Sequence, residues 1–265
     1  MKSDICVVIR GAGEMATGVA CRLFNSRLKV VLTDIDKPLA VRRAVSFCEA
    51  VYDGSKVVEG IEAVLVQGAD QIGRAHEQGR IPLVIDPDLK VLDLLKPEVL
   101  VEATLSKKDT GLNADLAPLV IALGPGFEVP QNADFVIETN RGHNLGRVYN
   151  RGKAEANTGV PGNIAGKTWE RVLRAPGDGV FETDCKLGDK VTAGQVVGMV
   201  GNLPVKSLLN GVLRGLIRNG TRTHKSLKLG DVDPRGQVEY LYTISEKARA
   251  VGGSVLETIM KVYNK

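Results

Sequence analysis

Short apolar runs and helical stripes alternate along the first half of the chain. Strand candidates at Ile5–Ile9 and Lys29–Thr33 flank a segment in which Met15, Val19 and Leu23 recur at helical spacing. Further strands are expected at Ala63–Val66, Pro82–Ile85, Val99–Ala103, Leu119–Leu123 and Phe135–Ile137, with a helix over Ala69–Gln78. Strands that alternate with helices predict an α/β fold on a Rossmann-like, mostly parallel sheet.

The pattern changes beyond Arg174 to short β-type runs divided by glycine and aspartate. These runs repeat at an offset of 32 residues, so that Gly179-Val180 aligns with Gly211-Val212 and Gly198 aligns with Gly230. Such duplication favours a small pseudo-symmetric β-sandwich. The last segment carries Val251, Val255, Ile259 and Val262 at helical spacing, which predicts a terminal helix over about Glu246–Tyr263.

These patterns suggest four consecutive parts. They are a Rossmann-like nucleotide-binding domain at 1–140, a glycine-rich junction at 141–170, a small β-rich domain at 171–240 and a C-terminal helix at 241–265. The pieces around Gly177-Asp178-Gly179 and Gly188-Asp189-Lys190 resemble biotinyl and lipoyl barrel-sandwich domains. The turn that would carry the modified lysine reads Gly201-Asn202-Leu203-Pro204, so no covalent biotin or lipoate is expected.

A glycine-rich turn follows the first predicted strand. It consists of Gly11, Ala12, Gly13, Glu14, Met15 and Ala16. A strand, a G-x-G-x-x-A sequence and a helix form the context of a dinucleotide-binding turn, in which backbone N–H groups face a pyrophosphate. Asp34 ends the second strand about twenty residues further on, where a carboxylate can accept hydrogen bonds from a ribose. Asp36 competes for that role, and Arg42-Arg43 would instead suit a 2′-phosphate.

Two further sets of polar residues are candidates for function. Arg141, His143 and Arg147 lie among glycines and could form an anion-binding loop, or a hairpin with solvated arginines. Asp86, Glu102 and Glu138 come at or after strand ends, where each is either a catalytic carboxylate, a helix cap or a surface group. For acid–base chemistry the weak candidates are His143 and Lys107 or its neighbour Lys108.

Composition narrows the function classes. A net charge of +4 with basic and acidic residues mixed, and only 4% aromatic residues, argues against nucleic-acid binding. No apolar run reaches membrane-spanning length, and the four scattered cysteines indicate reduced thiols in a cytoplasmic protein. With three histidines and no CxxC, no metal site is assigned, although carboxylates alone could still hold a magnesium ion.

Five segments together resemble a known family, the YqeB-type accessory proteins of selenium-dependent molybdenum hydroxylases, which share a theme with the XdhC group. The segments are Arg10–Gly18, Leu123–Phe127, Arg141–Arg147, Asn157–Gly162 and the run from Arg171 to Arg235. The resemblance implies a cytoplasmic maturation factor whose partner is such a hydroxylase. It supplies no catalytic residues.

Two function classes therefore remain open, besides a scaffold protein in which the glycine turn is vestigial. In the first, an accessory protein binds a phosphate-bearing small molecule, either NAD(P) or a molybdopterin-type cofactor, at the glycine turn. In the second, the chain is an NAD-dependent oxidoreductase that acts on a small molecule. The sequence decides neither whether a reaction is catalysed nor whether the chain forms a homo-oligomer.

Overall fold

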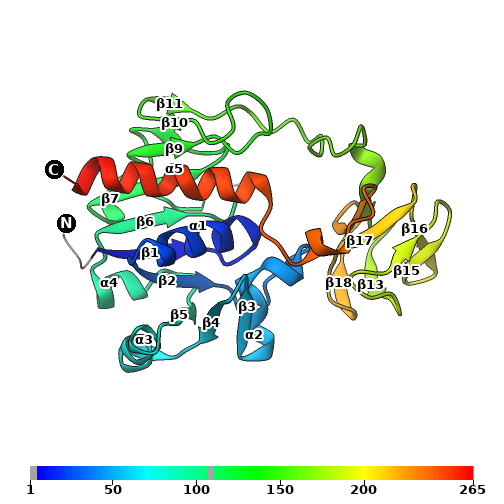
Figure 1. Ribbon diagram of the computed structural model, residues 1–265, viewed down its shortest axis with the longest axis horizontal. Helices are drawn as coiled ribbons and strands as arrows, with labels where there is room; N and C mark the ends of the chain where they lie inside the picture. The colour runs from blue at the N-terminus through cyan, green and yellow to red at the C-terminus, as the bar shows by residue number, and fades with distance from the viewer. Residues whose placement is uncertain (1–4, 107–109, 265) are drawn as a thin grey trace. The chain divides into compact units, whose positions relative to one another are not determined.

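The computed structural model describes residues 5–106 and 110–264. The chain divides into two compact units, and neither is a continuous stretch of sequence (Figure 1). Unit 1 comprises residues 1–38, 46–157 and 244–265, and unit 2 comprises residues 39–45 and 158–243. The four consecutive parts suggested by the sequence stay a prediction.

Unit 1 is built on a nine-stranded sheet in the order β10-β9-β7-β6-β1-β2-β5-β4-β3. Its strands are β1 (Cys6–Arg10), β2 (Lys29–Asp34), β3 (Ser55–Val58), β4 (Ile61–Leu65), β5 (Ile81–Ile85), β6 (Val99–Glu102), β7 (Leu119–Leu123), β9 (Phe135–Ile137) and β10 (Val148–Tyr149). The inner pairs from β9 to β4 are parallel, whereas β3 and β10 pair antiparallel at the two edges. Strands β8 (Glu128–Val129) and β11 (Gly152–Lys153) form a separate two-stranded sheet.

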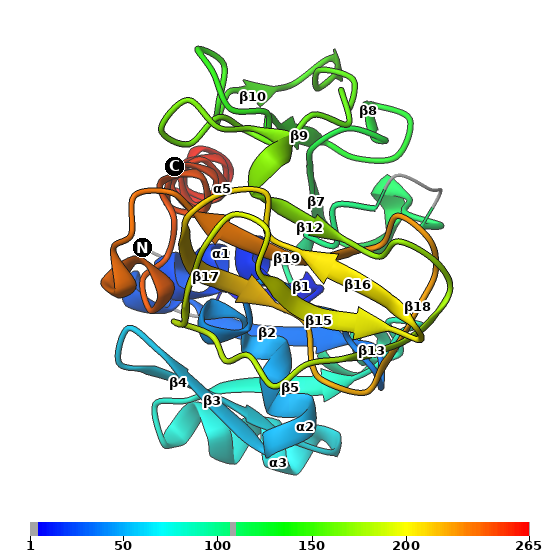
Figure 2. The same cartoon turned by 90° about the vertical axis from the view of Figure 1, so that its right-hand side faces the viewer.

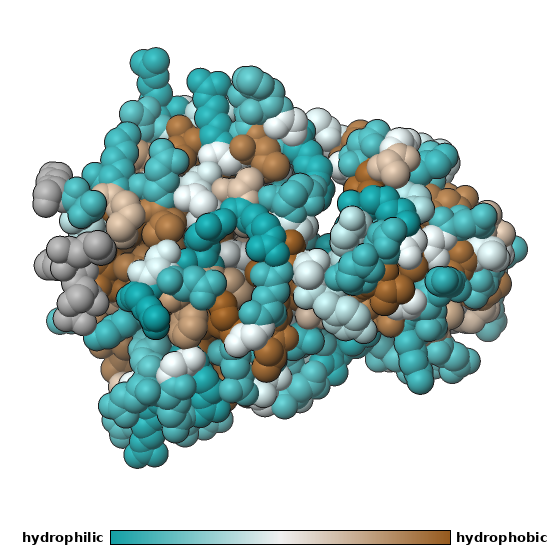
Figure 3. Space-filling model, viewed as in Figure 1, coloured by the Kyte–Doolittle hydropathy of each residue, from teal (hydrophilic) through white to brown (hydrophobic). Residues whose placement is uncertain are grey.

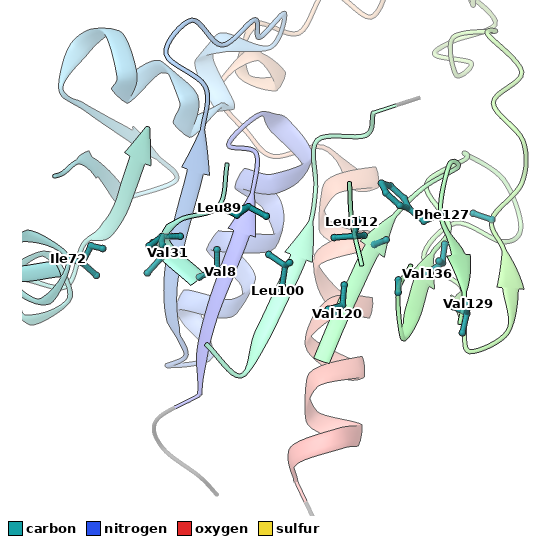
Figure 4. Packing of buried hydrophobic residues seen from close by; sticks show 14 of the residues in the cluster. Val8, Val31, Ile72, Leu89, Leu100, Leu112, Val120, Phe127, Val129 and Val136 are labelled. Carbon is teal, nitrogen blue, oxygen red and sulfur yellow. The ribbon is translucent and has the colours of Figure 1, made fainter. Parts of the chain in front are cut away.

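Apolar side chains cover both faces of the central strands, as buried parallel strands require. All five residues of β7 are buried, and Val7, Val8 and Ile9 of β1 have no exposed surface. One cluster joins Val8, Val31, Leu100 and Val120 from neighbouring strands, and Figure 4 shows their side chains together on one face of the sheet.

Five α-helices accompany these strands in the described part of unit 1. They are α1 (Glu14–Asn25), α2 (Ala50–Asp53), α3 (Gly68–Glu77), α4 (Val91–Leu95) and α5 (Glu246–Tyr263), with short 3₁₀ turns η2 (Phe47–Glu49) and η3 (Ala114–Leu116). Helix α5 spans the residues that the spacing of its apolar positions predicted. Its first turn is capped by Ser245, whose hydroxyl accepts the Ala248 N–H.

Helices α1 and α5 approach each other closely (Figure 1). A Cβ built on Gly18 would lie 2.7 Å from the Ala248 Cβ, and one built on Gly252 would lie 2.9 Å from the Gly18 carbonyl oxygen. Only residues without side chains fit at such distances. Helix α5 therefore fixes the position of α1, and with it the turn that precedes α1.

Unit 2 consists of two antiparallel four-stranded sheets, one of which faces the viewer in Figure 2. Their orders are β12-β19-β17-β14 and β16-β15-β13-β18. The strands are β12 (Val172–Arg174), β13 (Gly179–Glu182), β14 (Lys190–Val191), β15 (Val196–Val200), β16 (Leu203–Lys206), β17 (Gly211–Leu216), β18 (Thr221–Thr223) and β19 (Lys228–Asp233), with 3₁₀ turns η1 (Arg43–Val45), η4 (Trp169–Arg171) and η5 (Val238–Leu241).

The 32-residue repeat of the sequence relates strands of these two sheets. Strands β13, β14 and β15 correspond to β17, β18 and β19, and each sheet takes one strand from the other repeat: β14 pairs with β17, and β18 pairs with β13. The distant segment Leu39–Val45 also belongs to this unit. The Val41 carbonyl accepts the Leu216 N–H, and Arg42 donates to the carbonyls of Tyr240 and Thr243.

The predicted fold class is wrong. The structure has a large mixed sheet and three antiparallel sheets in interleaved units, in place of a Rossmann-like mostly parallel domain followed by a small barrel-sandwich-like domain and a helix. The antiparallel edge strands β3 and β10 are four and two residues long. Strands this short carry no hydrophobic run, so the periodicity of the sequence does not reveal them. The passage of residues 39–45 into unit 2 depends on long-range hydrogen bonds that local patterns do not contain.

The surface is mixed in character. Figure 3 shows one face on which hydrophilic and hydrophobic residues alternate in small areas. Among the helices of residues 5–106 and 110–264, none has the length and apolar character needed to cross a membrane.

The contact between α1 and α5 predicts opposite effects at two adjacent glycines of α5. Gly252→Ala is expected to lower the free energy of unfolding by about 1–3 kcal/mol, because the added methyl overpacks against α1. Gly253→Ala, where a Cβ meets nothing within 4 Å, is expected to raise it by about 0.5–1 kcal/mol. Urea unfolding measures both, and equal effects at the two positions would contradict the described packing.

Unit 2 depends on a buried group of charges. Asp231 pairs with both Arg171 and Arg214, and all three side chains are almost fully buried. Asp231→Asn is expected to lower the free energy of unfolding by about 3–5 kcal/mol, because it leaves buried arginine charge uncompensated. Exposed Asp184→Asn is the control and should change it by less than about 0.5 kcal/mol. A comparable loss in both variants, measured by urea unfolding, would show that the buried pairing is unimportant.

Candidate functional site

The glycine turn lies at the carboxyl edge of the parallel strands, between β1 and α1. Gly11 has a positive φ of 95°, and a Cβ there would lie 3.3 Å from both Cα and Cγ2 of Thr104 in the loop after β6. Gly11 is therefore required by the fold itself, because it provides both the turn and the close approach of a neighbouring loop.

Gly13 differs from Gly11 in each of these respects. Its φ of −70° is open to any residue, and a Cβ there would meet nothing within 4 Å. Gly13 is the N-cap of α1 and supplies no side-chain cap to the helix. Among the described residues, no acceptor takes a hydrogen bond from the Gly13 N–H. The fold does not explain why this position is glycine, and the space beside it is open.

Two of the turn's amides are already used within the protein. The Gly11 N–H donates to the Thr33 carbonyl at 2.8 Å, and the Ala12 N–H donates to Asp34 Oδ2 at 2.8 Å. The Ala12 carbonyl in turn accepts the Cys48 N–H. The predicted anion site is thus narrowed to the backbone from Gly13 into the first turn of α1. Glu14 opens that helix, and the side chains of Met15 and Ala16 are buried, so these last two residues could contribute only backbone.

Asp34 ends β2, as expected, but its carboxylate is partly engaged. Oδ1 accepts the Ile35 N–H and Oδ2 accepts the Ala12 N–H, so Asp34 fastens the glycine turn to β2. Burial raises the pKa of the Asp34 carboxyl, and these two backbone hydrogen bonds oppose the rise without cancelling it. A carboxylate has about four acceptor positions, so capacity for a ligand hydroxyl remains.

The other strand-end carboxylates also hold backbone. Asp86 accepts the N–H groups of Lys90 and Val91 at the start of α4. Fully buried Glu102 accepts the N–H and hydroxyl of Thr104. Glu138, also fully buried, accepts the N–H groups of Asn140 and Glu155. The structure thus gives each of the three a structural role.

Sequence reasoning assigned no role to Arg10, the last residue of β1. In the parallel register Arg10 lies between Thr33 of β2 and Glu102 of β6. Its guanidinium donates to Glu102 at 3.3 Å, to the Thr110 carbonyl at 2.8 Å and to the Pro87 carbonyl at 3.1 Å. Arg10 therefore joins three segments at this edge. The feature of the sequence that could have indicated this role is a charged residue directly at the end of an apolar strand.

Strands β9 and β10 form an antiparallel hairpin, and the proposed anion-binding loop connects them. Arg141 donates to Glu246 at the start of α5, at 2.8 Å. Arg147 is exposed and packs over the Tyr149 ring at 5.5 Å, and His143 is exposed. Internal contacts thus engage both arginines, while anion binding by this loop stays a prediction.

Groups suited to nucleophilic or metal chemistry are scarce in the described chain. Burial raises the pKa of the Cys6 thiol to about 11 and that of Cys21 to about 12, so neither is ionised near neutral pH. Residues 5–106 and 110–264 contain no group of three or more His, Cys, Asp or Glu side chains that could hold a metal ion. Lys107 and Lys108 lie outside the described residues.

Comparison with known proteins connects the chain to one curated relative. It is 46% identical over 259 residues to a protein of Escherichia coli (strain K12) described as "Uncharacterized protein YqeB", and the match covers 98% of this chain and 48% of the relative. The chain is thus a homologue of YqeB and spans about half the length of the curated relative it matches. No family model matches the sequence.

Solved structures give only a weak likeness. An aspartoacylase family protein from Mesorhizobium loti is 11% identical, with 86% of this chain and 84% of that chain covered and a TM-score of 0.26. The product-bound ectoine utilization protein EutE (DoeB) from Ruegeria pomeroyi is 10% identical, with 86% and 85% covered and a TM-score of 0.27. At these TM-scores the likeness carries no argument about activity.

The raised pKa of Asp34 predicts a pH dependence with a definite sign. A carboxyl whose pKa is higher in the folded chain favours folding most below its ordinary pKa, and this contribution falls as pH rises through the folded-state value. The free energy of unfolding of the wild type minus that of Asp34→Asn should therefore decrease between acidic and neutral pH. Urea unfolding at a series of pH values measures this difference. A difference that grows with pH would contradict the burial of Asp34.

Proposed function

We propose that this chain binds a small phosphate-bearing ligand, a nucleotide or a pterin-type cofactor, at the turn that precedes α1. In this proposal it serves as a cytoplasmic accessory protein of a selenium-dependent molybdenum hydroxylase. The observation that supports ligand binding is Gly13, a glycine that neither φ nor packing requires, next to open space at the start of a twelve-residue helix.

The chemistry of that position suits a phosphate. The first N–H groups of a helix have no partner within the helix, and the helix dipole places partial positive charge beside them. A glycine N-cap leaves these groups open to a ligand, where serine or aspartate would cover them. Phosphate oxygens are the acceptors that such a helix start takes in many nucleotide-binding proteins.

Asp34 supports a ligand that carries hydroxyl groups close to its phosphate. Its oxygens already accept two backbone N–H groups and retain positions for a hydroxyl donor. A sugar hydroxyl fits this requirement, whereas a second phosphate beside the carboxylate would be repelled. The choice between NAD(P) and a molybdopterin-type cofactor is left to the experiment.

The hydroxylase partner rests on the five-segment motif resemblance. The homology to YqeB, a relative described as uncharacterized, supports the family part of that resemblance and not the partner. Deletion of the gene, followed by assay of selenium content and activity of the hydroxylase, tests this part alone. A fully active, selenium-loaded enzyme in the deletion strain would end it without affecting ligand binding. The oxidoreductase alternative shares the glycine turn and Asp34. Its acid–base candidate His143 is exposed on the β9–β10 hairpin, and Lys107 and Lys108 lie outside the described residues.

A substitution at Gly13 tests the site directly. Thermal unfolding of the wild type with NAD, NADP, ATP, CTP or molybdopterin should show a stabilising ligand, since a ligand at 100 times its Kd adds about 2.7 kcal/mol. Gly13→Val should fold normally, because its φ and surroundings accept a side chain, and should lose this stabilisation.

Gly73→Val is the matched control, since a Cβ on this glycine of α3 also meets nothing within 4 Å. It should keep the ligand-induced shift of the melting temperature. No shift in the wild type with any of the five compounds, or an unchanged shift in Gly13→Val, would refute the proposed site.

A further inference from the structure

Charge is distributed unequally between the two units. Unit 2 contains 14 Lys and Arg and eight Asp and Glu, whereas the remaining 21 basic and 23 acidic residues belong to unit 1. The positive net charge of the chain therefore arises in unit 2 alone. From Lys190 to Gly230 the sequence contains seven Lys and Arg and no Asp or Glu.

Because two of its carboxylates are buried, the surface of unit 2 is more basic than its count of charged residues indicates. Asp231 and Asp233 are fully buried and pair with Arg171, Arg214 and Arg235. Burial alone would raise the pKa of Asp233, but hydrogen bonds from Arg235 and the charges of Arg214 and Arg235 hold it below its ordinary value. Both carboxylates are therefore used inside the unit and do not balance the exposed cations.

Three of these cations lie around neighbouring strands. Arg222 of β18 is directly opposite Val180 of β13, and both are exposed. Lys225 lies between β18 and β19, and its N–H donates to Asp178. Arg174 at the end of β12 donates to the Ser226 carbonyl. Within the described part of the chain, none of these three side chains forms an ion pair.

Apolar surface accompanies the cations. Val180 is 40% exposed and Leu203 is 46% exposed. The two are close, because the Val180 carbonyl accepts the Gly201 N–H and Leu203 Cδ1 lies 2.8 Å from where a Cβ of Gly177 would be. Arg174, Val180, Leu203, Arg222 and Lys225 together are called the basic patch below. The exposed Asp178 lies beside Lys225, so the patch surrounds one carboxylate with three cations. Most of the basic patch belongs to the sheet β16-β15-β13-β18, which faces the viewer in Figure 2.

We propose that the basic patch is a docking surface for an acidic segment of a partner protein. Complementary charge steers association and selects partners, and a small apolar centre with a charged rim is the usual composition of a protein interface. The patch contains no aromatic side chain on which a base could stack, so a protein partner is favoured over a nucleic acid.

A fluorescently labelled poly-glutamate peptide is the probe, with anisotropy measured on the full chain. Binding is expected at about 10 mM salt and should weaken strongly at about 150 mM, where the Debye length falls from about 30 Å to about 8 Å. The triple variant Arg174→Ser, Arg222→Ser, Lys225→Ser should bind about tenfold more weakly, since each exposed ion pair contributes modestly.

The control triple variant is Lys37→Ser, Arg74→Ser, Lys90→Ser, which removes the same charge from exposed positions of unit 1. It should bind the peptide within about twofold of the wild type. An equal loss in both triple variants, or no binding at low salt, would refute the patch. Tighter binding of a DNA oligonucleotide or of phosphatidylserine vesicles than of poly-glutamate would refute a protein partner. Circular dichroism confirms that all variants fold.

Discussion

Acidic side chains that accept backbone N–H groups hold the carboxyl edge of the nine-stranded sheet together. Asp34 fastens the glycine turn to β2, Glu102 holds the loop after β6, and Glu138 holds the residues after β9. Buried N–H groups need acceptors, and a carboxylate accepts them strongly. This constraint fixes the loops at the edge where ligands of parallel sheets bind. It also gives the strand-end carboxylates Glu102 and Glu138 a structural role.

At this edge of the sheet, one N–H group of the glycine turn is not used by the protein itself. The amides of Gly11 and Ala12 are used by Thr33 and Asp34, whereas the Gly13 N–H has no partner among residues 5–106 and 110–264. Helix α1 is held by close packing on α5, where Gly18 meets Ala248 without room for a methyl group. A fixed helix start with the Gly13 N–H open is prepared for an anion before the anion arrives, which reduces the cost of binding.

Unit 2 separates its charges by burial. Its two buried aspartates neutralise arginines in the interior, so they do not balance the exposed cations of β12 and β18. Removing an aspartate from such a group would be costly, because the buried guanidinium would lose its counter-charge. The same arrangement that stabilises the interior thus leaves the outer surface basic. Stability and partner recognition in this unit therefore share one cause.

The sequence by itself determined the glycine turn, the helix over Glu246–Tyr263 and the 32-residue repeat, because each depends on local spacing or local backbone freedom. It also placed Asp34 at the end of β2. Only the tertiary structure decided that Asp34 binds the Ala12 N–H, that Arg10 joins three segments and that residues 39–45 belong to unit 2. These features depend on residues between 22 and 201 positions apart. Hydrogen bonds over such separations leave no periodic trace in the sequence, so only the folded chain reveals them.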